Sequence, residues 1–335
     1  MSITIRDISE HLGVSTSTVS KALNGYSDVS HETIQRVSAA AIKLGYYPNT
    51  AARSLSRQRT DKIGVVLNYP VNMVNDFLSE LIPGAAEAAE QVDYNLTLYT
   101  STERQPERIN RICRAREVDG LLLLWPSNLD QMSKLMVEEA MPYIVLPRRI
   151  QNQTASYVAA DHHKSGRQLT EHLIKLGHTR IGFTRYPELF ETHADRLAGY
   201  RTALENATIL FDESLVIETT VHATKHDRSI LYKFLALENP PTALLCFTDP
   251  MAMRALAAAH QLGLHVPDDL SIVGHDGILT SGMTVPALTT ARQPIPEMGR
   301  LAVECLLARI HDPTLPPAQH LLPIELVIRH STGKL

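Results

Sequence analysis

Residues 4–25 read TIRDISEHLGVSTSTVSKALNG, and this stretch predicts two short helices joined by a tight turn. Thr4 and Asp7 have the spacing of a capping box, in which the two residues satisfy each other's backbone groups. Gly13 stands where a left-handed residue ends a helix, and Ser15 can cap the helix that follows. Apolar residues recur at helical spacing in both segments, so the two helices should share one small core.

A third helix should begin at Ser30 and end at Gly45, with an apolar stripe along one side. The shared core is expected to take the apolar residues in and beside the second helix: Val14, Val19, Ala22 and Leu23. The polar residues that remain should point outward: Thr16, Ser17, Ser20 and Lys21. Hydroxyls and a cation can read base edges and phosphates in the major groove of DNA. A small solvated helical bundle is the alternative that this pattern alone leaves open.

The charge of the chain is unevenly divided. The 335 residues carry a net charge of −4, and 44% of them are hydrophobic and 20% charged, which excludes a disordered chain or a collagen-like fibre. Residues 1–62 hold eight basic and five acidic side chains, a net +3, whereas the other 273 residues carry −7. A cationic head on an anionic body suits a polyanionic partner, because polyanions attract basic surfaces.

The segment after the third helix narrows the interpretation from a general helix-turn-helix pattern to a particular set of motifs. Residues 46–57 read YYPNTAARSLSR, which begins like a helix but is too short to be stable alone. With this segment the chain resembles the lactose-repressor (LacI/GalR) family of bacterial transcription regulators. The motifs that carry the resemblance are TIRDI at 4–8, GVS at 13–15, TVSKALN at 18–24, GY at 45–46, PN at 48–49 and AARSL at 51–55.

The resemblance implies a helix-turn-helix DNA-binding domain at 1–48 and a hinge helix with linker at 49–62. In that family the hinge helix pairs with its two-fold mate in the minor groove and wedges a leucine into a base step, the position that Leu55 holds here. Ordinary linker packing is the alternative for Leu55. The residues expected at DNA are Thr4, Ser15, Thr16, Ser17, Thr18, Ser20, Lys21, Asn24, Asn49, Ala52 and Leu55.

From residue 63 onward, short apolar runs alternate with amphipathic helical stretches, which is typical of parallel sheets covered on both faces. The helices predicted there lie at 76–92, 164–176, 195–206, 229–237 and 250–262. The expected fold class is therefore an all-α head with a hinge helix, followed by an α/β body. About 270 residues are many for one sheet, so the body should contain two doubly wound parallel-sheet lobes.

The family resemblance also implies that the body looks like a periplasmic sugar-binding protein, in which three strands cross between the two lobes. The effector-binding and dimerisation domain is expected at 63–335. Its N-lobe should comprise about 63–160 and 292–321, and its C-lobe about 161–291 and 322–335.

The expected effector site follows from the direction of the strands, since ligands of open α/β sheets bind beyond the carboxyl ends. The residues expected there are Asn68, Asn72, Trp125, Arg148, Arg196, Thr248, Asp276 and Gln293. A carboxylate and a guanidinium can bond to vicinal hydroxyls of a sugar, and an aromatic ring can cover its C–H face. By resemblance, Arg196 and Asp276 match family positions that hold effector hydroxyls.

Three positions at this site depart from the family's usual residues: Pro147, Thr248 and Gly277. The identity of the sugar therefore stays open. Arginines also outnumber the one expected carboxylate, which leaves a sugar phosphate or sugar acid as an alternative to a neutral sugar. The arginines are Arg148, Arg149 and Arg196. Whether the effector releases DNA or strengthens its binding is open as well.

Catalytic and metal sites are not expected. Asp161, His162 and His163 resemble a metal-ligand cluster, but adjacent histidines point from different sides of a helix, so we expect neither a metal nor a cofactor. The motifs of nucleotide, phosphoryl, serine-hydrolase and zinc-protease sites do not occur in the sequence. The alternative class is a binding protein or enzyme of sugar metabolism whose head is only a dimerisation or partner-binding module. The polar outward face of the second helix argues against it.

The expected function is that of a sequence-specific DNA-binding transcriptional regulator, a repressor of sugar-utilisation genes controlled by a small sugar or sugar derivative bound between the lobes. The expected partners are double-stranded, pseudo-palindromic operator DNA, the effector and a second copy of the chain in a homodimer. No leucine-heptad tail follows the last strand, which favours a dimer over a tetramer. Phe77, Leu78, Leu81 and Ile82 are candidates for the dimer surface, although some of them should cover the lobe's own sheet.

A cytoplasmic location, at the nucleoid when DNA is bound, is also expected. The hydrophobic runs are at most five residues long, as at 121–125, far shorter than the roughly 20 residues that cross a bilayer. The N-terminus lacks the pattern of a secretory signal. The three cysteines lie far apart in the sequence and should be reduced.

Overall fold

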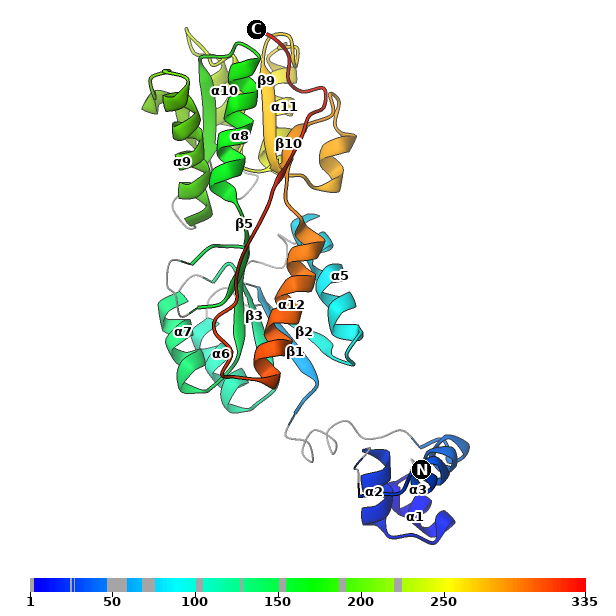
Figure 1. Cartoon of the computed structure of the whole chain (residues 1–335). Helices are drawn as coiled ribbons and strands as arrows, with labels where there is room; N and C mark the ends of the chain where they lie inside the picture. Colours follow the sequence, from blue (N-terminus) through cyan, green and yellow to red (C-terminus); the bar gives the residue numbers. More distant parts are fainter. Residues whose placement is uncertain are drawn as a thin grey trace. The chain divides into compact units, whose positions relative to one another are not determined.

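The computed structural model describes residues 3–24, 26, 28–46, 59–67, 76–100, 105–126, 129–150, 155–186, 191–219 and 225–335. The chain divides into two compact units, Met1–Asp61 and Lys62–Leu335, the second of which contains both sheets (Figure 1). Within the described ranges, none of the helices combines the length and the apolar composition that a bilayer span requires.

The first unit is a domain of three helices, α1 (Ile5–Leu12), α2 (Thr16–Leu23) and α3 (His31–Leu44). The predicted helix ends are confirmed, because Gly13 and Gly45 follow α1 and α3 with left-handed φ angles of 66° and 71°. The residues buried between the helices are Ile8, Val19, Ala22, Val37, Ala40 and Ala41. Val14 and Leu23 are only partly buried and pack against this core.

The second unit contains two six-stranded sheets. The first sheet, which defines the N-lobe, has the order β11 (Gln319–Leu322), β5 (Tyr157–Ala160), β4 (Tyr143–Leu146), β3 (Gly120–Leu124), β1 (Lys62–Leu67), β2 (Asn95–Thr100). The second sheet, which defines the C-lobe, has the order β12 (Glu325–Val327), β10 (Thr289–Arg292), β9 (Ser271–Asp276), β8 (Ala243–Leu245), β6 (Ile181–Arg185), β7 (Val216–Glu218). Neighbouring strands run parallel except β10 and β12, which are antiparallel.

Helices cover both faces of each sheet, as Figure 1 shows. The N-lobe helices are α5 (Asp76–Glu90), α6 (Gln105–Arg114), α7 (Leu129–Glu138) and α12 (Ile295–His311). The C-lobe helices are α8 (His162–Lys175), α9 (Glu191–Asn206), α10 (Lys225–Leu235) and α11 (Asp249–Gln261), with short 3₁₀ turns η2 (Glu213–Leu215) and η3 (Leu279–Met283). Every predicted body helix is present with its ends shifted by at most four residues, whereas α6, α7 and α12 were not predicted.

The alternation of side chains along the strands explains the two helix layers. Leu122 and Leu124 of β3 belong to the core that includes α5 and α12, whereas Leu121 and Leu123 belong to the core of α6 and α7. A strand buried on both sides must be apolar at every position, as β3 is. This arrangement confirms the predicted fold class of an α-helical head and two doubly wound lobes.

The placement of Phe77, Leu78 and Leu81 corrects one expectation. These α5 side chains are 5%, 4% and 1% exposed in the N-lobe core, so they cannot also form a dimer surface. Ile82 is half-buried against the same core. The sequence showed the apolar stripe of α5 but not that α12 and the sheet cover it.

Three segments pass from one lobe to the other: between β5 and α8, between β10 and α12, and between β11 and β12. Side chains also join the lobes. The Leu279 amide donates to Glu80 Oε1 at 3.2 Å, and the Thr280 hydroxyl donates to the Asp76 carboxylate. The carboxyl ends of β4 and β9 lie next to these crossings, so residues far apart in the sequence can share one site there.

Candidate DNA-binding face and effector site

The first turn of α2 presents polar side chains to solvent. Thr16 and Ser17 are exposed there, and Val19 and Ala22 are buried on the other side of the helix. Ser20 is half-buried. The N-terminus of a helix favours a negative charge such as a phosphate, because its first N–H groups and the helix dipole are oriented toward it. Of the predicted outward residues, Thr16, Ser17 and Lys21 are exposed, and Thr16 and Ser17 lie at the helix N-terminus.

Several other residues expected at DNA have structural contacts within the first unit. The Ser15 hydroxyl accepts from the Thr18 amide at 3.0 Å and lies 2.8 Å from the Thr18 hydroxyl. The Thr4 hydroxyl donates to Asp7 at 2.8 Å, and Asn24 Nδ2 donates to the Ser20 carbonyl at 2.8 Å. These contacts fix the ends of α1 and α2. The candidates Asn49, Ala52 and Leu55 lie outside the described residues.

The cation of α2 has an acidic partner. The Lys21 ammonium forms an ion pair with the Asp28 carboxylate, and both side chains are about half exposed. The hydrogen bond between the two groups, together with their opposite charges, raises the pKa of Lys21 and lowers the pKa of Asp28. A DNA phosphate that binds Lys21 must therefore compete with Asp28.

In the C-lobe, Arg196 of α9 lies in a buried polar cluster and is 4% exposed. Its Nη2 lies 3.5 Å from Asp276 Oδ1, and its Nε lies 3.3 Å from Nδ1 of His162. Its Nη1 donates to the carbonyl of Phe247, and the guanidinium carbon lies 4.2 Å from the centroid of the Phe247 ring. Burial lowers the pKa of Arg196 to about 10, which leaves it charged at neutral pH.

Asp276 ends β9 with a φ of 113°, which turns its carboxylate toward Arg196. Gln293 Nε2 donates to Asp276 Oδ1 at 2.7 Å, and the Gln293 amide donates to the Asp276 carbonyl at 2.9 Å. Burial raises the pKa of Asp276 to about 6, against the opposing effect of Arg196. The structure thus brings together three of the expected effector residues, Arg196, Asp276 and Gln293.

Thr248 and Asp249 begin α11 beside this cluster. The Thr248 hydroxyl accepts from the Met251 amide at 3.3 Å and so caps the helix. Asp249 is fully buried and holds the loop after β9, because its Oδ2 accepts from the amides of Gly277 and Ile278 at 2.8 and 3.0 Å. Burial and the nearby Asp276 raise the pKa of Asp249 to about 8.

The N-lobe contributes Trp125 and Arg148 at the ends of β3 and β4. Trp125 is half-buried with a left-handed φ of 49°, and its ring centroid lies 5.3 Å from that of Phe77. Arg148 is half-buried, and its Nη1 donates to the Pro126 carbonyl at 3.4 Å. Asn68 and Asn72 lie outside the described residues.

The sequence did not indicate the two buried histidines of this cluster as part of the effector site. His275 is fully buried, and its Nε2 lies 2.7 Å from the Ser165 hydroxyl. Burial and Arg196 hold the pKa of His275 well below its usual value. His162 is buried beside Arg196, whereas the adjacent His163 is exposed, so the two rings diverge as predicted. Among the described residues no group of three potential metal ligands occurs.

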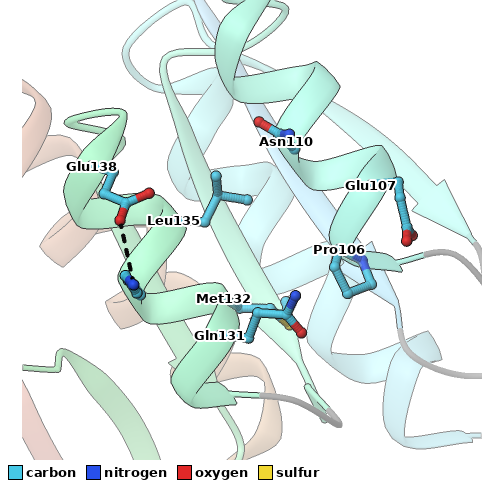
Figure 2. A pocket seen from close by; sticks show the side chains of 8 residues that line it. Pro106, Glu107, Asn110, Gln131, Met132, Leu135 and Glu138 are labelled. Carbon is cyan, nitrogen blue, oxygen red and sulfur yellow. Dashed lines mark ion pairs between the residues drawn. The ribbon is translucent and has the colours of Figure 1, made fainter.

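A groove of about 300 Å³ lies elsewhere, between α6 and α7 of the N-lobe (Figure 2). Its lining includes Pro106, Asn110 and Leu135, together with Glu138, which pairs with Lys134 at 3.9 Å. None of the expected effector residues lines this groove. It is therefore separate from the cluster around Arg196.

Comparisons with known proteins agree with both units. Residues 4–49 match the model of bacterial regulatory proteins of the lacI family, and residues 170–332 match that of periplasmic binding protein-like domains. The chain is 32% identical to the HTH-type transcriptional regulator DegA of Bacillus subtilis (strain 168), over 100% of this chain and 99% of the relative. The chain belongs to the LacI family of bacterial transcription regulators.

Solved structures extend the similarity of this LacI-family regulator to its whole length. A lac repressor dimer bound to operator and the anti-inducer ONPF has a TM-score of 0.86 at 27% identity, over 99% of this chain and 100% of that chain. A complex of the regulator CelR with cellobiose has a TM-score of 0.75 at 29% identity, over 98% of this chain and 99% of that chain. The protein is therefore a DNA-binding transcriptional regulator and not an enzyme.

Proposed function

We propose that this LacI-family regulator represses sugar-utilisation genes by binding a pseudo-palindromic operator as a homodimer. A small sugar or sugar derivative bound between the lobes sets its operator affinity. The observation that carries the proposal is the buried Arg196, Asp276 and Gln293 cluster next to the crossings between lobes. The lac repressor bound to operator and CelR bound to cellobiose support both halves of the proposal.

We further propose the domain limits 1–48, 49–62 and 63–335, with the division of the last into N-lobe and C-lobe given above. The location proposed is the cytoplasm, at the nucleoid when DNA is bound. The residues proposed at DNA and at the effector are those predicted from the sequence. Thr16 and Ser17 are the best placed of the described residues in the head, and Arg196 and Asp276 in the body.

Operator binding should be strongly salt-dependent, because each phosphate contact releases counterions. Two heads of net charge +3 each would face the DNA. A gel-shift titration of the full chain on DNA flanking its own gene, repeated from 50 to 200 mM salt, measures the slope of log affinity against log salt. A steep negative slope of about −0.9 for each phosphate contacted is expected. A slope near zero would contradict the proposal.

Asp28→Asn should strengthen DNA binding, because it removes the carboxylate that competes for Lys21. We expect a gain of about tenfold at low salt and a salt slope that steepens by about 0.9, the value of one further phosphate contact. The matched control is Glu32→Gln, which changes the charge of the head equally at an exposed residue of α3. Equal gains in both variants would show that only net charge matters and that Lys21 is not a contact.

The effector proposal predicts a class of ligand by its chemistry. Arg196 and Asp276 can exchange their mutual contact for hydroxyls of a ligand, and a ring such as Trp125 can cover an apolar face. A thermal-shift screen of sugars, sugar phosphates and sugar acids tests this on the full chain. A ligand at 100 times its dissociation constant should stabilise the protein by about 2.7 kcal/mol.

The homodimer requires a surface other than the buried side of α5 that carries Phe77, Leu78 and Leu81. The segment around η3 supplies one, because Leu279, Met283 and Val285 are 72%, 67% and 96% exposed in the monomer. We propose a second copy as its partner, since a lac repressor dimer matches the chain over nearly its full length. Val285→Asp should then convert the dimer to monomer in analytical ultracentrifugation. Val137→Asp, at a 74% exposed site on α7, is the control that should leave the dimer intact.

A further inference from the structure

His162 contacts both lobes. It is the first residue of α8, just after the chain crosses into the C-lobe, and it is 2% exposed. Its Nε2 lies 3.4 Å from the carbonyl oxygen of Pro147, which follows β4 of the N-lobe. Its Nδ1 lies 3.3 Å from both Nε and Nη2 of Arg196, which belongs to the C-lobe. One imidazole ring therefore joins the effector arginine to the opposite lobe.

The chemistry of the two partners fixes the proton on this ring. A guanidinium can only donate and a carbonyl can only accept, so His162 Nδ1 must accept from Arg196 and Nε2–H must donate to Pro147. The neutral Nε2–H tautomer satisfies both contacts at once. The charged imidazolium would have no acceptor for Arg196 and would place two cations in contact.

The hydrogen-bonded path continues beyond Arg196 to a second crossing. Arg196 donates to Asp276, and Asp276 accepts from both the side chain and the amide of Gln293. Gln293 directly follows β10, where the chain returns to the N-lobe. The path from Pro147 through His162, Arg196 and Asp276 to Gln293 thus begins and ends where the lobes are connected.

We propose that His162 is a positioning residue that couples the effector site to the N-lobe. The inference rests on the proposed effector site at Arg196 and Asp276. An effector oxygen that accepts an Arg196 N–H group competes with His162 Nδ1 for it. Binding then changes the orientation or the hydrogen bond of the ring and with it the link to Pro147. The lobes then have two arrangements, one with the His162–Pro147 link and one without it. The effector shifts the equilibrium between them by as much as its affinities for the two differ.

The only tryptophan of the sequence gives a direct test without effector or DNA. Trp125 follows β3, and the next residue, Pro126, accepts from Arg148 beside Pro147. Acrylamide quenching of Trp125 in the full chain therefore reports access to this side of the N-lobe. His162→Leu should raise the quenching constant about twofold, since it removes one contact between the lobes. His163→Leu is the matched control, because that ring is exposed, and it should leave quenching unchanged.

A double-mutant cycle separates coupling from independent structural effects. Arg196→Lys keeps the charge beside Asp276 but loses the planar donors that reach His162, so it should also raise quenching. If both residues act through one path, the quenching constant of the double variant should be little or no higher than that of the more strongly affected single variant. Additive effects would overturn the proposal, as would wild-type quenching in His162→Leu.

A conservative variant guards against simple unfolding. His162→Gln keeps one acceptor and one donor in the same side chain. It should reverse at least about half of the rise in the Trp125 quenching constant that His162→Leu causes. If His162→Leu fails to fold, His162→Gln and Arg196→Lys still complete a cycle, and additivity there overturns the proposal. Operator binding by the wild-type chain is measured separately. A wild-type chain that did not bind operator would contradict the proposed function and would leave the quenching result unchanged.

Discussion

Gly199→Ala is expected to destabilise the C-lobe by about 3 kcal/mol or more. A Cβ atom at Gly199 of α9 would lie 2.0 Å from the His163 carbonyl oxygen and 2.7 Å from the Arg167 amide nitrogen of α8. Both neighbours are backbone atoms, which cannot rotate away. The two helices would have to separate, and Arg196, one turn before Gly199, would move with α9.

The sign of the stability change distinguishes close helix packing from helix propensity. Alanine normally stabilises a helix interior by about 1 kcal/mol over glycine, so only the close helix contact predicts a loss. Urea unfolding followed by circular dichroism measures it. Ala198→Gly, at the adjacent exposed position, is the matched control and should cost no more than about 1 kcal/mol. A Gly199→Ala protein as stable as the wild type would contradict the close packing of α8 on α9.

The head was the most predictable part of the chain because its signals are local. Thr4, Gly13, Ser15, Ser30 and Gly45 each act on their own helix end, and each is found at the predicted end. The Lys21–Asp28 pair was not predicted, because the sequence does not show that Asp28 lies next to Lys21. A charge count assigns both residues to the head but cannot show that they neutralise each other.

The body was predictable in type but not in detail. Alternating apolar runs and helical stretches indicated the two lobes, yet α12 was missed although its apolar residues are as regular as those of the predicted helices. The dimer candidates Phe77, Leu78 and Leu81 were misplaced for a related reason. Their apolar stripe is a local signal, whereas the α12 helix that covers it lies more than 200 residues later.

The site shows the same division between local and distant signals. Arg196 and Asp276 were expected there through family resemblance, and the structure places them 3.5 Å apart. His162 was considered only as a metal ligand, because the sequence cannot show that Pro147 and Arg196 lie on its two sides. Asp249 was not among the predicted site residues. Its role in holding the loop after β9 depends on Gly277 and Ile278, which lie far along the chain.

Asp249→Asn should make the C-lobe more stable than the wild type at pH 8.5 but not at pH 4.5. The pKa of Asp249 is raised to about 8 by burial and the charge of Asp276, from the model-compound value of 3.8. Between these values the unfolded chain has lost a proton that the folded protein retains. The stabilisation present at acid pH is therefore lost as the pH rises toward 8, by up to about 1.4 kcal/mol per pH unit.

Asparagine at this position stays neutral at every pH and so removes that loss. Its Oδ1 can accept from the Gly277 and Ile278 amides, and its Nδ2 can donate to the Thr290 hydroxyl, so the loop keeps its contacts. Urea unfolding of wild type and variant from pH 4.5 to 8.5 should give a difference that grows with pH and reaches about 2 kcal/mol or more. Asp269→Asn is the control, because hydrogen bonds from His265 lower the pKa of that exposed carboxyl, so its effect should not grow as the pH rises. A constant difference between wild type and Asp249→Asn would mean that Asp249 is ionised throughout, held as an anion by its three donors.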